Sequence, residues 1–164
     1  MQGIILQVNV SPGGLPKRPV PEGLVEALGI AGDLHAHPEV HGGLRQAILL
    51  LAAETVDALA ARGYPVFFGA LGENLTTRGL PLRDLRIGDR LRAGGALVEI
   101  TKPRGPCGQL DRYGKSIKNE IYDARVEARD PSSPRWGMSG LYAGVVEPGM
   151  VRPGDIIAVV GKSA

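Results

Sequence analysis

The sequence predicts a mainly β protein with peripheral helices, folded as a mixed, closed or nearly closed β barrel. Short apolar, β-branched runs recur along the 164-residue chain, as is typical of strands. The chain has 24 glycines and 13 prolines, which place many turns between short elements and argue against a helical bundle. Roughly six to eight short strands with two or three helices are consistent with a barrel whose helices lie outside it.

The strand predictions rest on apolar runs that end at turn-forming residues. Gly3–Val10 stops at Ser-Pro-Gly-Gly, and Gly94-Gly95 offers a hairpin turn suited to positive φ. In Ala96–Thr101 the odd-numbered residues face one way and the even-numbered ones the other, so we expect one buried face. The other predicted strands are Val66–Phe68, Asn74–Thr77, Arg90–Arg92, Leu141–Val146 and Asp155–Val160. A further strand is expected within Glu22–Ile30, which alternates imperfectly.

Two longer segments carry the apolar spacing of helices. Leu51–Gly63 has an apolar stripe at intervals of four residues and stops at a glycine, shortly before Pro65. Lys115–Arg129 places isoleucines and alanines on one face and ends before Pro131. We also expect a short helix over Gly108–Tyr113.

Composition excludes several classes of protein. The chain is predicted to be one domain over residues 1–164. Its net charge is +2, its charges are scattered, and it has one Trp, four Tyr and two Phe, so nucleic-acid binding is not expected. The longest apolar run, Ala47–Ala53, is too short to span a membrane. Met1–Val10 lacks the pattern of a signal peptide, and we therefore expect a cytoplasmic protein.

Cys107 is the single cysteine and cannot form an internal disulfide. It follows a long predicted strand, precedes the short predicted helix, and has Lys102 and Arg104 close in sequence. A helix N-terminus and nearby positive charges favour the thiolate, which is the form that binds a metal or attacks an electrophile. The alternative is an inert thiol that packs as a small hydrophobic residue.

The three histidines, His35, His37 and His41, lie within a polar stretch at residues 31–43. His35 and His37 would share one face of an extended segment. The spacing from His37 to Glu39 does not match a cupin metal motif, so a metal site made of histidines alone is disfavoured. A solvated loop, or phosphate and carboxylate contacts through His41 and the two glycines that follow it, fits this stretch better.

Two further motifs allow both a structural and a functional interpretation. Asn74 follows a glycine turn and offers two donors and an acceptor, suited to the edge of a heterocycle or to neighbouring backbone groups. Arg135 is suited to binding an anion, while Trp136 could simply fill one end of the barrel. The sequence contains no dinucleotide-binding glycine motif, P-loop or nucleophile elbow.

Taken together, these motifs resemble those of the MOSC family, named for the C-terminal domain of molybdenum cofactor sulfurases. The strongest match is Gly72-Glu-Asn-Leu75 followed by Pro103-Arg-Gly-Pro-Cys107. The other parts, in order, are Gly32-Asp33, His41-Gly-Gly43, Ile87-Gly-Asp89, Trp136-Gly137 and Gly154-Asp155. The resemblance extends from Gly32 to Val159 and implies a mixed β barrel similar to the barrel domain of pyruvate kinase.

The resemblance also implies a molybdenum cofactor, which is a pterin with a terminal phosphate. Cys107 then corresponds to the family's cysteine, which ligates molybdenum or carries sulfur as a persulfide, and a soft thiolate suits such a centre. The residues expected to bind the cofactor are Lys102, Arg104 and Arg135 at the phosphate, and Asn74 and His41 at the pterin edge.

Two activities follow from this resemblance. One is the reduction of N-hydroxylated compounds with electrons from a partner protein, and the other is sulfur transfer. The alternatives are a non-catalytic sulfur carrier or adaptor that is loaded by a cysteine desulfurase, and a barrel that has lost its cofactor. Larger relatives carry a further domain before or after the barrel. We therefore expect a pocket that is shallow, is completed by a second copy in a homodimer, or holds the cofactor weakly.

Overall fold

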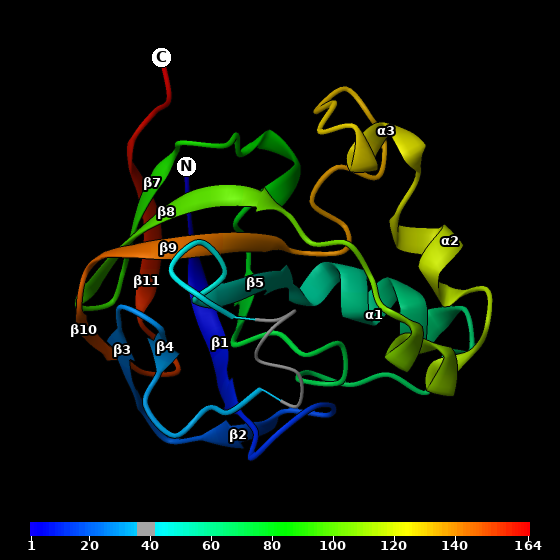
Figure 1. Cartoon of the computed structure of the whole chain (residues 1–164), viewed down its shortest axis with the longest axis horizontal. Coiled ribbons are helices and arrows are strands. Elements are labelled where there is room, and N and C mark those ends of the chain that lie inside the picture. Colours follow the sequence, from blue (N-terminus) through cyan, green and yellow to red (C-terminus); the bar gives the residue numbers. More distant parts are fainter. Residues whose placement is uncertain (36–41) are drawn as a thin grey trace.

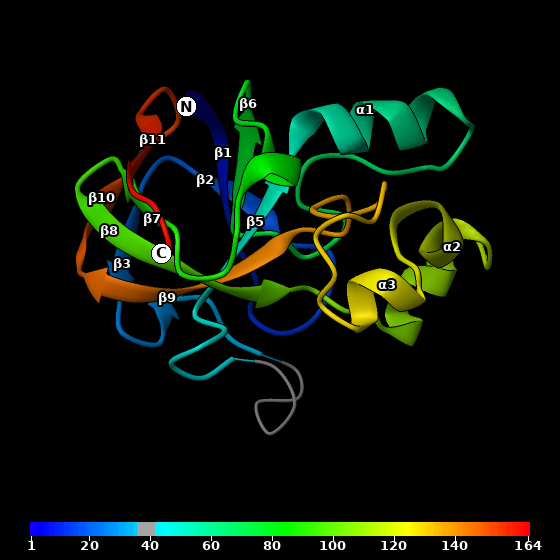
Figure 2. The same ribbon diagram turned by 90° about the horizontal axis from the view of Figure 1, so that it is seen from above.

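The computed structural model describes residues 1–35 and 42–164 of the chain. The described residues form a closed β barrel, with a small second sheet beside it (Figure 1). The helices α1, α2 and α3 all lie on one side of the barrel, which is clearest from above (Figure 2). The predicted class, mainly β with peripheral helices, is confirmed.

Seven strands close the barrel in the order β11, β7, β8, β9, β5, β6 and β1, because β1 pairs again with β11. The pair β5–β6 is parallel and the other neighbours are antiparallel, so the sheet is mixed. The bounds are β1 Gln2–Val10, β5 Ile48–Ala52, β6 Leu75–Arg78, β7 Arg90–Ala93, β8 Ala96–Pro103, β9 Leu141–Glu147 and β11 Ile156–Gly161.

The first strand is shared between three neighbours. Residues 2–4 of β1 pair with β11, and residues 8–10 pair with β2 (Arg18–Val20), which lengthens the sheet beyond the barrel. Between Ile5 and Gln7 the register against β6 shifts, and such a bulge bends a strand. The separate sheet consists of β10 (Gly149–Val151), β3 (Gly23–Glu26) and β4 (Gly29–Ile30).

The helices are short and pack outside the barrel. The parallel pair β5–β6 requires a crossover, and this crossover contains α1 (Ala53–Ala61). After β8 the chain forms three short turns of helix, which are η2 (Gly108–Tyr113), α2 (Ile117–Ile121) and α3 (Ala124–Glu127). A further 3₁₀ turn, η1 (Leu82–Asp84), precedes β7. None of the helices in the described ranges is long and apolar enough to span a membrane.

The hydrophobic core has two parts that meet at β5. Ile48 and Leu50 belong to the barrel interior, where Trp136 is also buried and donates its indole N–H to the carbonyl of Leu85 at 2.8 Å. Leu51, on the other side of β5, belongs to a second cluster with side chains of α1, η2 and α2. The strand is therefore covered on both faces, and all five of its residues are buried.

The prediction of a helix over Leu51–Gly63 is wrong at its start. Residues 48–52 form β5, and α1 begins at Ala53 and ends at Ala61. A strand buried on both faces has a continuous apolar run instead of an alternating one, and such a run cannot be told from a buried helix by periodicity. The apolar run Ala47–Ala53 therefore carries no signal of the boundary between the two elements.

The prediction of one helix over Lys115–Arg129 is also wrong, because the segment breaks at Tyr122 and Asp123. Both residues have extended backbone, and the Asp123 carboxylate accepts a hydrogen bond from the backbone N–H of Val126 at 2.9 Å. Asp123 thus caps a new helix, α3. Short polar side chains such as Asp are favoured at this position. The apolar spacing continues through the break and conceals it.

Among the predicted strands, Gly3–Val10, Asn74–Thr77, Leu141–Val146, Asp155–Val160 and the hairpin are confirmed with small changes at their ends. The strand expected within Glu22–Ile30 is confirmed as β3, which pairs with β4, whereas Val66–Phe68 is not a strand. The expected single buried face of β8 is wrong, since Leu97 and Thr101 on its outer side are 8% and 5% exposed. The Thr101 hydroxyl donates to the carbonyl of Arg45, and β10 packs against β8.

The barrel interior provides a test of the core. Replacing the buried Leu50 by Ala (Leu50→Ala) should lower the free energy of unfolding by about 2–5 kcal/mol, because it removes apolar contacts and leaves a cavity. Leu28→Ala is the control, since that side chain is 65% exposed, and it should change stability by less than about 0.5 kcal/mol. Urea denaturation of both variants measures the difference. Equal stability of the two would contradict the assigned core.

Candidate functional site

A pocket of about 590 Å³, its open mouth included, lies beside the end of β8. Its wall combines the loop before β2, residues near His35 and Gly42, the turn before β6, the segment after β8, and Tyr142 on β9. Its polar side chains include Lys17, His35, Asn74, Arg104, Cys107 and Tyr142. Segments that are distant in sequence thus supply one set of chemical groups.

Cys107 lies on the wall of this pocket and is half-buried. It follows β8 with extended backbone, and η2 begins at the next residue. Burial raises the pKa of the neighbouring Tyr142 phenol, Arg104 opposes this rise, and negative charge on Cys107 adds to it. The thiol is therefore next to a neutral phenol and an arginine, and the interpretation of Cys107 as an inert residue sealed in the core does not hold.

Arg104 is a buried cation in the same wall, with 4% of its surface exposed. Its Nη2 donates to the carbonyl of Leu71 at 2.7 Å, and its Nη1 lies 3.5 Å from the carbonyl of Ser139. None of the described carboxylates lies within ion-pair distance of its guanidinium. Its positive charge is held by neutral carbonyl groups, so it remains available to an anion in the pocket.

Lys17 is the second cation of the pocket and forms a buried ion pair. Its Nζ lies 2.5 Å from Oδ2 of Asp33, and the two side chains are 8% and 2% exposed. Asp33 also accepts hydrogen bonds from the backbone N–H of Ser11 and from the Asn74 amide, each at 2.8 Å. Sequence reasoning missed Lys17, because a single lysine in a proline-rich loop carries no signal of burial.

Asn74 connects the barrel to this ion pair. Its Oδ1 accepts from the backbone N–H of Leu49 at 3.0 Å, and its Nδ2 donates to Asp33 and, at 3.3 Å, to the carbonyl of Asn9. Both N–H groups of the amide are thus used within the protein. The structural interpretation of Asn74, hydrogen bonding to neighbouring backbone groups, is confirmed, and binding at the edge of a heterocycle stays a prediction.

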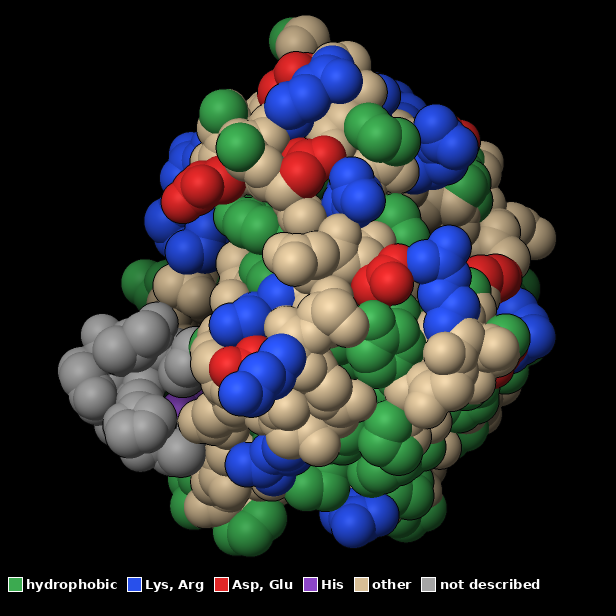
Figure 3. Space-filling model, turned by 90° about the vertical axis from the view of Figure 1, so that its right-hand side faces the viewer, with side chains coloured by type: hydrophobic (Ala, Val, Ile, Leu, Met, Phe, Trp, Pro, Cys, Tyr) green, Lys and Arg blue, Asp and Glu red, His purple; other side chains and the backbone are tan. Residues whose placement is uncertain are grey.

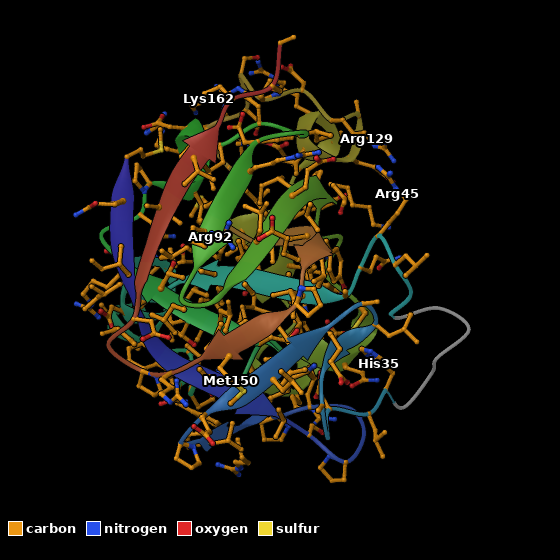
Figure 4. The ribbon with its side chains drawn as sticks, turned by 90° about the vertical axis from the view of Figure 1, so that its left-hand side faces the viewer. His35, Arg45, Arg92, Arg129, Met150 and Lys162 are labelled. Carbon is orange, nitrogen blue, oxygen red and sulfur yellow. The ribbon has the colours of Figure 1, made fainter. Side chains whose placement is uncertain are left out.

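His35 lies on the pocket wall beside Gly42. Figure 4 shows it at the opposite end of the molecule from Lys162 and Arg129. Burial, together with the positive charge of Lys17, lowers the pKa of His35, and Asp33 opposes this effect. His37 and His41, the latter predicted to bind the cofactor, lie outside the described residues. Within the described ranges, no three His, Cys, Asp or Glu side chains cluster as a metal site.

The remaining predicted cofactor ligands are not part of the pocket wall. The Lys102 ammonium lies 5.6 Å from the centre of the Tyr142 ring. Tyr142 lines the pocket, so Lys102 is next to the pocket wall but not part of it. Arg135 lies elsewhere, beside Trp136, and its Nη1 is 3.6 Å from an oxygen of Asp123. The structure therefore brings Cys107, Arg104 and Asn74 together, places Lys102 next to them, and separates Arg135.

Charge on the face that carries the helices is not concentrated. On the face that carries the helices, basic and acidic side chains alternate without a large region of one sign (Figure 3). Several of these charges form exposed pairs, such as Arg125 with Asp130, and exposed pairs contribute little to stability. The two buried cations of the pocket differ from this pattern.

Glu73, next to Asn74, is a fully buried carboxyl group that sequence reasoning did not single out. Its Oε1 accepts hydrogen bonds from the backbone N–H of Gly69 at 2.6 Å and from the Thr76 hydroxyl at 3.0 Å. Its Oε2 has no partner among the described residues. Burial raises the pKa of Glu73, and these hydrogen bonds and the charge of Arg104 oppose the rise.

Comparison with known proteins identifies the family. The family model of the MOSC domain matches residues 37–158, which is most of the chain. The chain belongs to the MOSC family. The resemblance inferred from the ordered motifs is thereby confirmed. Cys107 lies inside the matched region, whereas Lys17 and His35 on the same pocket wall precede it.

Curated MOSC relatives include the protein YiiM of Escherichia coli, which is 37% identical over 144 residues, and the uncharacterized protein YflK of Bacillus subtilis, which is 31% identical over 154 residues. The matches cover 85% and 91% of this chain but 59% and 64% of those proteins. The chain thus spans about three fifths of the length of these relatives. A protein named "Reductase" from Gibberella moniliformis is 28% identical, and the match covers 83% of this chain and 23% of that protein.

Solved structures have the same fold. YiiM from Geobacillus stearothermophilus superposes with a TM-score of 0.72 at 27% identity, over 97% of this chain and 75% of the other. YuaD from Bacillus subtilis superposes with a TM-score of 0.70 at 23% identity, over 96% of this chain and 94% of that one. The second likeness supports the fold alone.

The raised pKa of Glu73 predicts how its variant responds to pH. The ordinary pKa is 4.5, so above this value the unfolded chain releases a proton that the folded protein retains. The free energy of unfolding of the wild type should therefore fall, relative to that of Glu73→Gln, as pH rises above 4.5. Urea denaturation at a series of pH values measures this difference. A difference that does not change with pH would contradict a raised pKa.

Proposed function

We propose that this MOSC-domain protein binds a molybdenum cofactor through Cys107 and reduces N-hydroxylated compounds with electrons from a partner protein. The observation that carries the proposal is a half-buried thiol in a pocket whose wall also holds two buried cations, Lys17 and Arg104. The Cys107 thiolate is a soft ligand that suits molybdenum, and the cations beside it suit the phosphate of the cofactor.

The groups in the pocket fit such a cofactor. The pocket is open to solvent and combines apolar wall with a few convergent polar groups, as small-molecule sites do. A guanidinium has five N–H groups, and the Leu71 and Ser139 carbonyls accept from two nitrogens of Arg104, which leaves donors for a phosphate. Leu34, Leu49 and Leu71 supply apolar wall against a ring system.

Each residue has a distinct part in the proposed reaction. When bound, the cofactor would supply the two-electron redox change by which the hydroxyl oxygen leaves as water. Cys107 would ligate the metal, and Arg104 and Lys17 would hold the phosphate. The loss of water consumes two protons, and His35 is the imidazole on the pocket wall. Burial and the charge of Lys17 lower the pKa of His35 and so favour its neutral form. The leucines would limit the access of bulk water.

The comparisons support a reductive role in one respect. The relative from Gibberella moniliformis carries the name "Reductase", and this chain matches 23% of its length. The matched part includes most of this chain. Electron donation by a partner protein is part of the proposal, because the reduction consumes two electrons that an outside donor must supply.

A sulfur carrier is the second candidate function. The thiol is half-buried and lines an open pocket, so a persulfide formed on Cys107 could be reached by an acceptor. Incubation with a cysteine desulfurase and its substrate should then add about 32 Da, one sulfur atom, to the wild type and nothing to Cys107→Ala. Intact-protein mass spectrometry measures this change, and its absence would remove the second candidate.

The molybdenum content of purified protein tests the first candidate. Wild type, Cys107→Ala and Cys107→Ser are expressed in a host that makes the cofactor, and molybdenum is measured by mass spectrometry of the metal. We expect at least about a tenfold loss in both variants, because a methyl group or a hard hydroxyl replaces a soft thiolate ligand. Equal molybdenum content in wild type and Cys107→Ala would contradict ligation by the thiol.

Binding of inorganic phosphate tests the cationic wall without the cofactor. Arg104→Gln should weaken phosphate binding by about tenfold or more, because a charge-assisted contact is lost. Arg92→Gln is the control, since Arg92 lies on β7 outside the pocket, its side chain is 42% exposed, and it pairs with Glu147. Isothermal titration measures both affinities, and circular dichroism checks folding. Equal weakening by the two variants would indicate a general charge effect instead of a site.

A further inference from the structure

The turn formed by residues 67–73 has buried backbone groups that bond to side chains and loops instead of to a neighbouring strand. The carbonyls of Phe68, Gly69, Ala70, Leu71 and Glu73 accept hydrogen bonds from segments outside the turn. The donors, in the same order, are the Gln7 amide at 3.0 Å, the Lys17 backbone N–H at 2.9 Å, the Tyr113 hydroxyl at 2.9 Å, the Arg104 guanidinium at 2.7 Å and the Asn9 amide at 3.2 Å.

Two of these hydrogen bonds fix the cations of the pocket. The bond to Gly69 holds the backbone of Lys17, and the bond to Leu71 holds the guanidinium of Arg104. Both cations are buried and line the pocket. A shift of the turn would therefore move both positive charges together.

Glu73 closes this turn from inside. Its Oε1 accepts a hydrogen bond from the Gly69 N–H at 2.6 Å. The carbonyl of the same Gly69 accepts from the backbone N–H of Lys17. Gly69 has a φ of +97°, and a Cβ there would lie 2.2 Å from the carbonyl oxygen of Lys17. The turn and the Lys17 loop are thus in direct backbone contact at this point, and the position of Gly69 fixes both.

We propose that Glu73 is a positioning residue for the anion site of the pocket, acting through Gly69 on Lys17 and through Leu71 on Arg104. This inference rests on the proposed function, because it assigns the two cations to a bound phosphate. The acceptor oxygen of Glu73, and not a negative charge, performs this role.

The surroundings of Glu73 support an uncharged carboxylic acid. Thr76 of β6 forms a hydrogen bond with the Glu73 carboxyl group. Arg104, which follows β8, and Tyr113 of η2 face it and interact with it electrostatically. None of the described cations forms an ion pair with it. Burial without a paired cation favours the protonated form. Protonation of Glu73 would leave the charge of Arg104 to an anion in the pocket.

The test compares three variants of the full chain in phosphate binding at neutral pH, by isothermal titration. Glu73→Met keeps a similar volume but removes the acceptor, and should weaken binding by about tenfold. Glu73→Gln keeps the acceptor oxygen without charge, and should stay within about twofold of wild type. Thr76→Val removes the other hydrogen bond to the same oxygen, and should also stay within about twofold. Thermal melting of each variant measures the purely structural effect.

The outcomes separate this inference from the proposed function. Wild type that binds no phosphate would overturn both. Wild type that binds phosphate, with a folded Glu73→Met of equal affinity, would overturn the role of Glu73 alone. The role of Glu73 would also be overturned if Thr76→Val weakened phosphate binding as much as Glu73→Met does and lowered the melting temperature by the same amount. If Glu73→Met does not fold, the phosphate affinity of Glu73→Gln decides the question. A tenfold loss of affinity in Glu73→Gln would show that the charge of Glu73 matters, and not its acceptor oxygen.

Discussion

Hydrogen bonding of buried backbone carbonyls in the 67–73 turn is the constraint on which the pocket depends. A buried carbonyl without a donor is costly, and this turn has no neighbouring strand to supply donors. Side chains of β1, η2 and the segment after β8 supply the donors instead, together with the backbone N–H of Lys17. These hydrogen bonds bring Arg104 and Lys17, which are far apart in sequence, to one wall.

The two cations of that wall are held by different means. Lys17 is paired with Asp33, which is bonded in turn by Asn74 and the Ser11 backbone, so its burial cost is offset by a complete network. Arg104 contacts neutral carbonyls and, within the described residues, no carboxylate. The pocket thus has one compensated and one uncompensated positive charge beside Cys107, and an arginine of this kind is suited to an anionic ligand.

Membership of the MOSC family accounts for the order of motifs along the chain. The sequence was sufficient to predict the barrel class and the hairpin at Gly94. Two of the predicted site residues, Cys107 and Asn74, lie on one pocket wall. It did not predict the buried ion pair of Lys17, since one lysine between prolines looks like a surface residue. The expected role of Arg135 depended on its type and motif, but its guanidinium lies beside Asp123, away from the pocket.

Local residue chemistry by itself determined where turns interrupt the chain, and which thiol, amide and arginine carry a family pattern. Glycine and proline restrict φ locally, so these features need no distant partner. Tertiary structure alone decided that residues 48–52 are a strand buried on both faces, that Asp123 divides a helical pattern, and that Glu73 lies under the pocket. In each case a contact with a distant segment overrode or completed a local preference that the sequence left undecided.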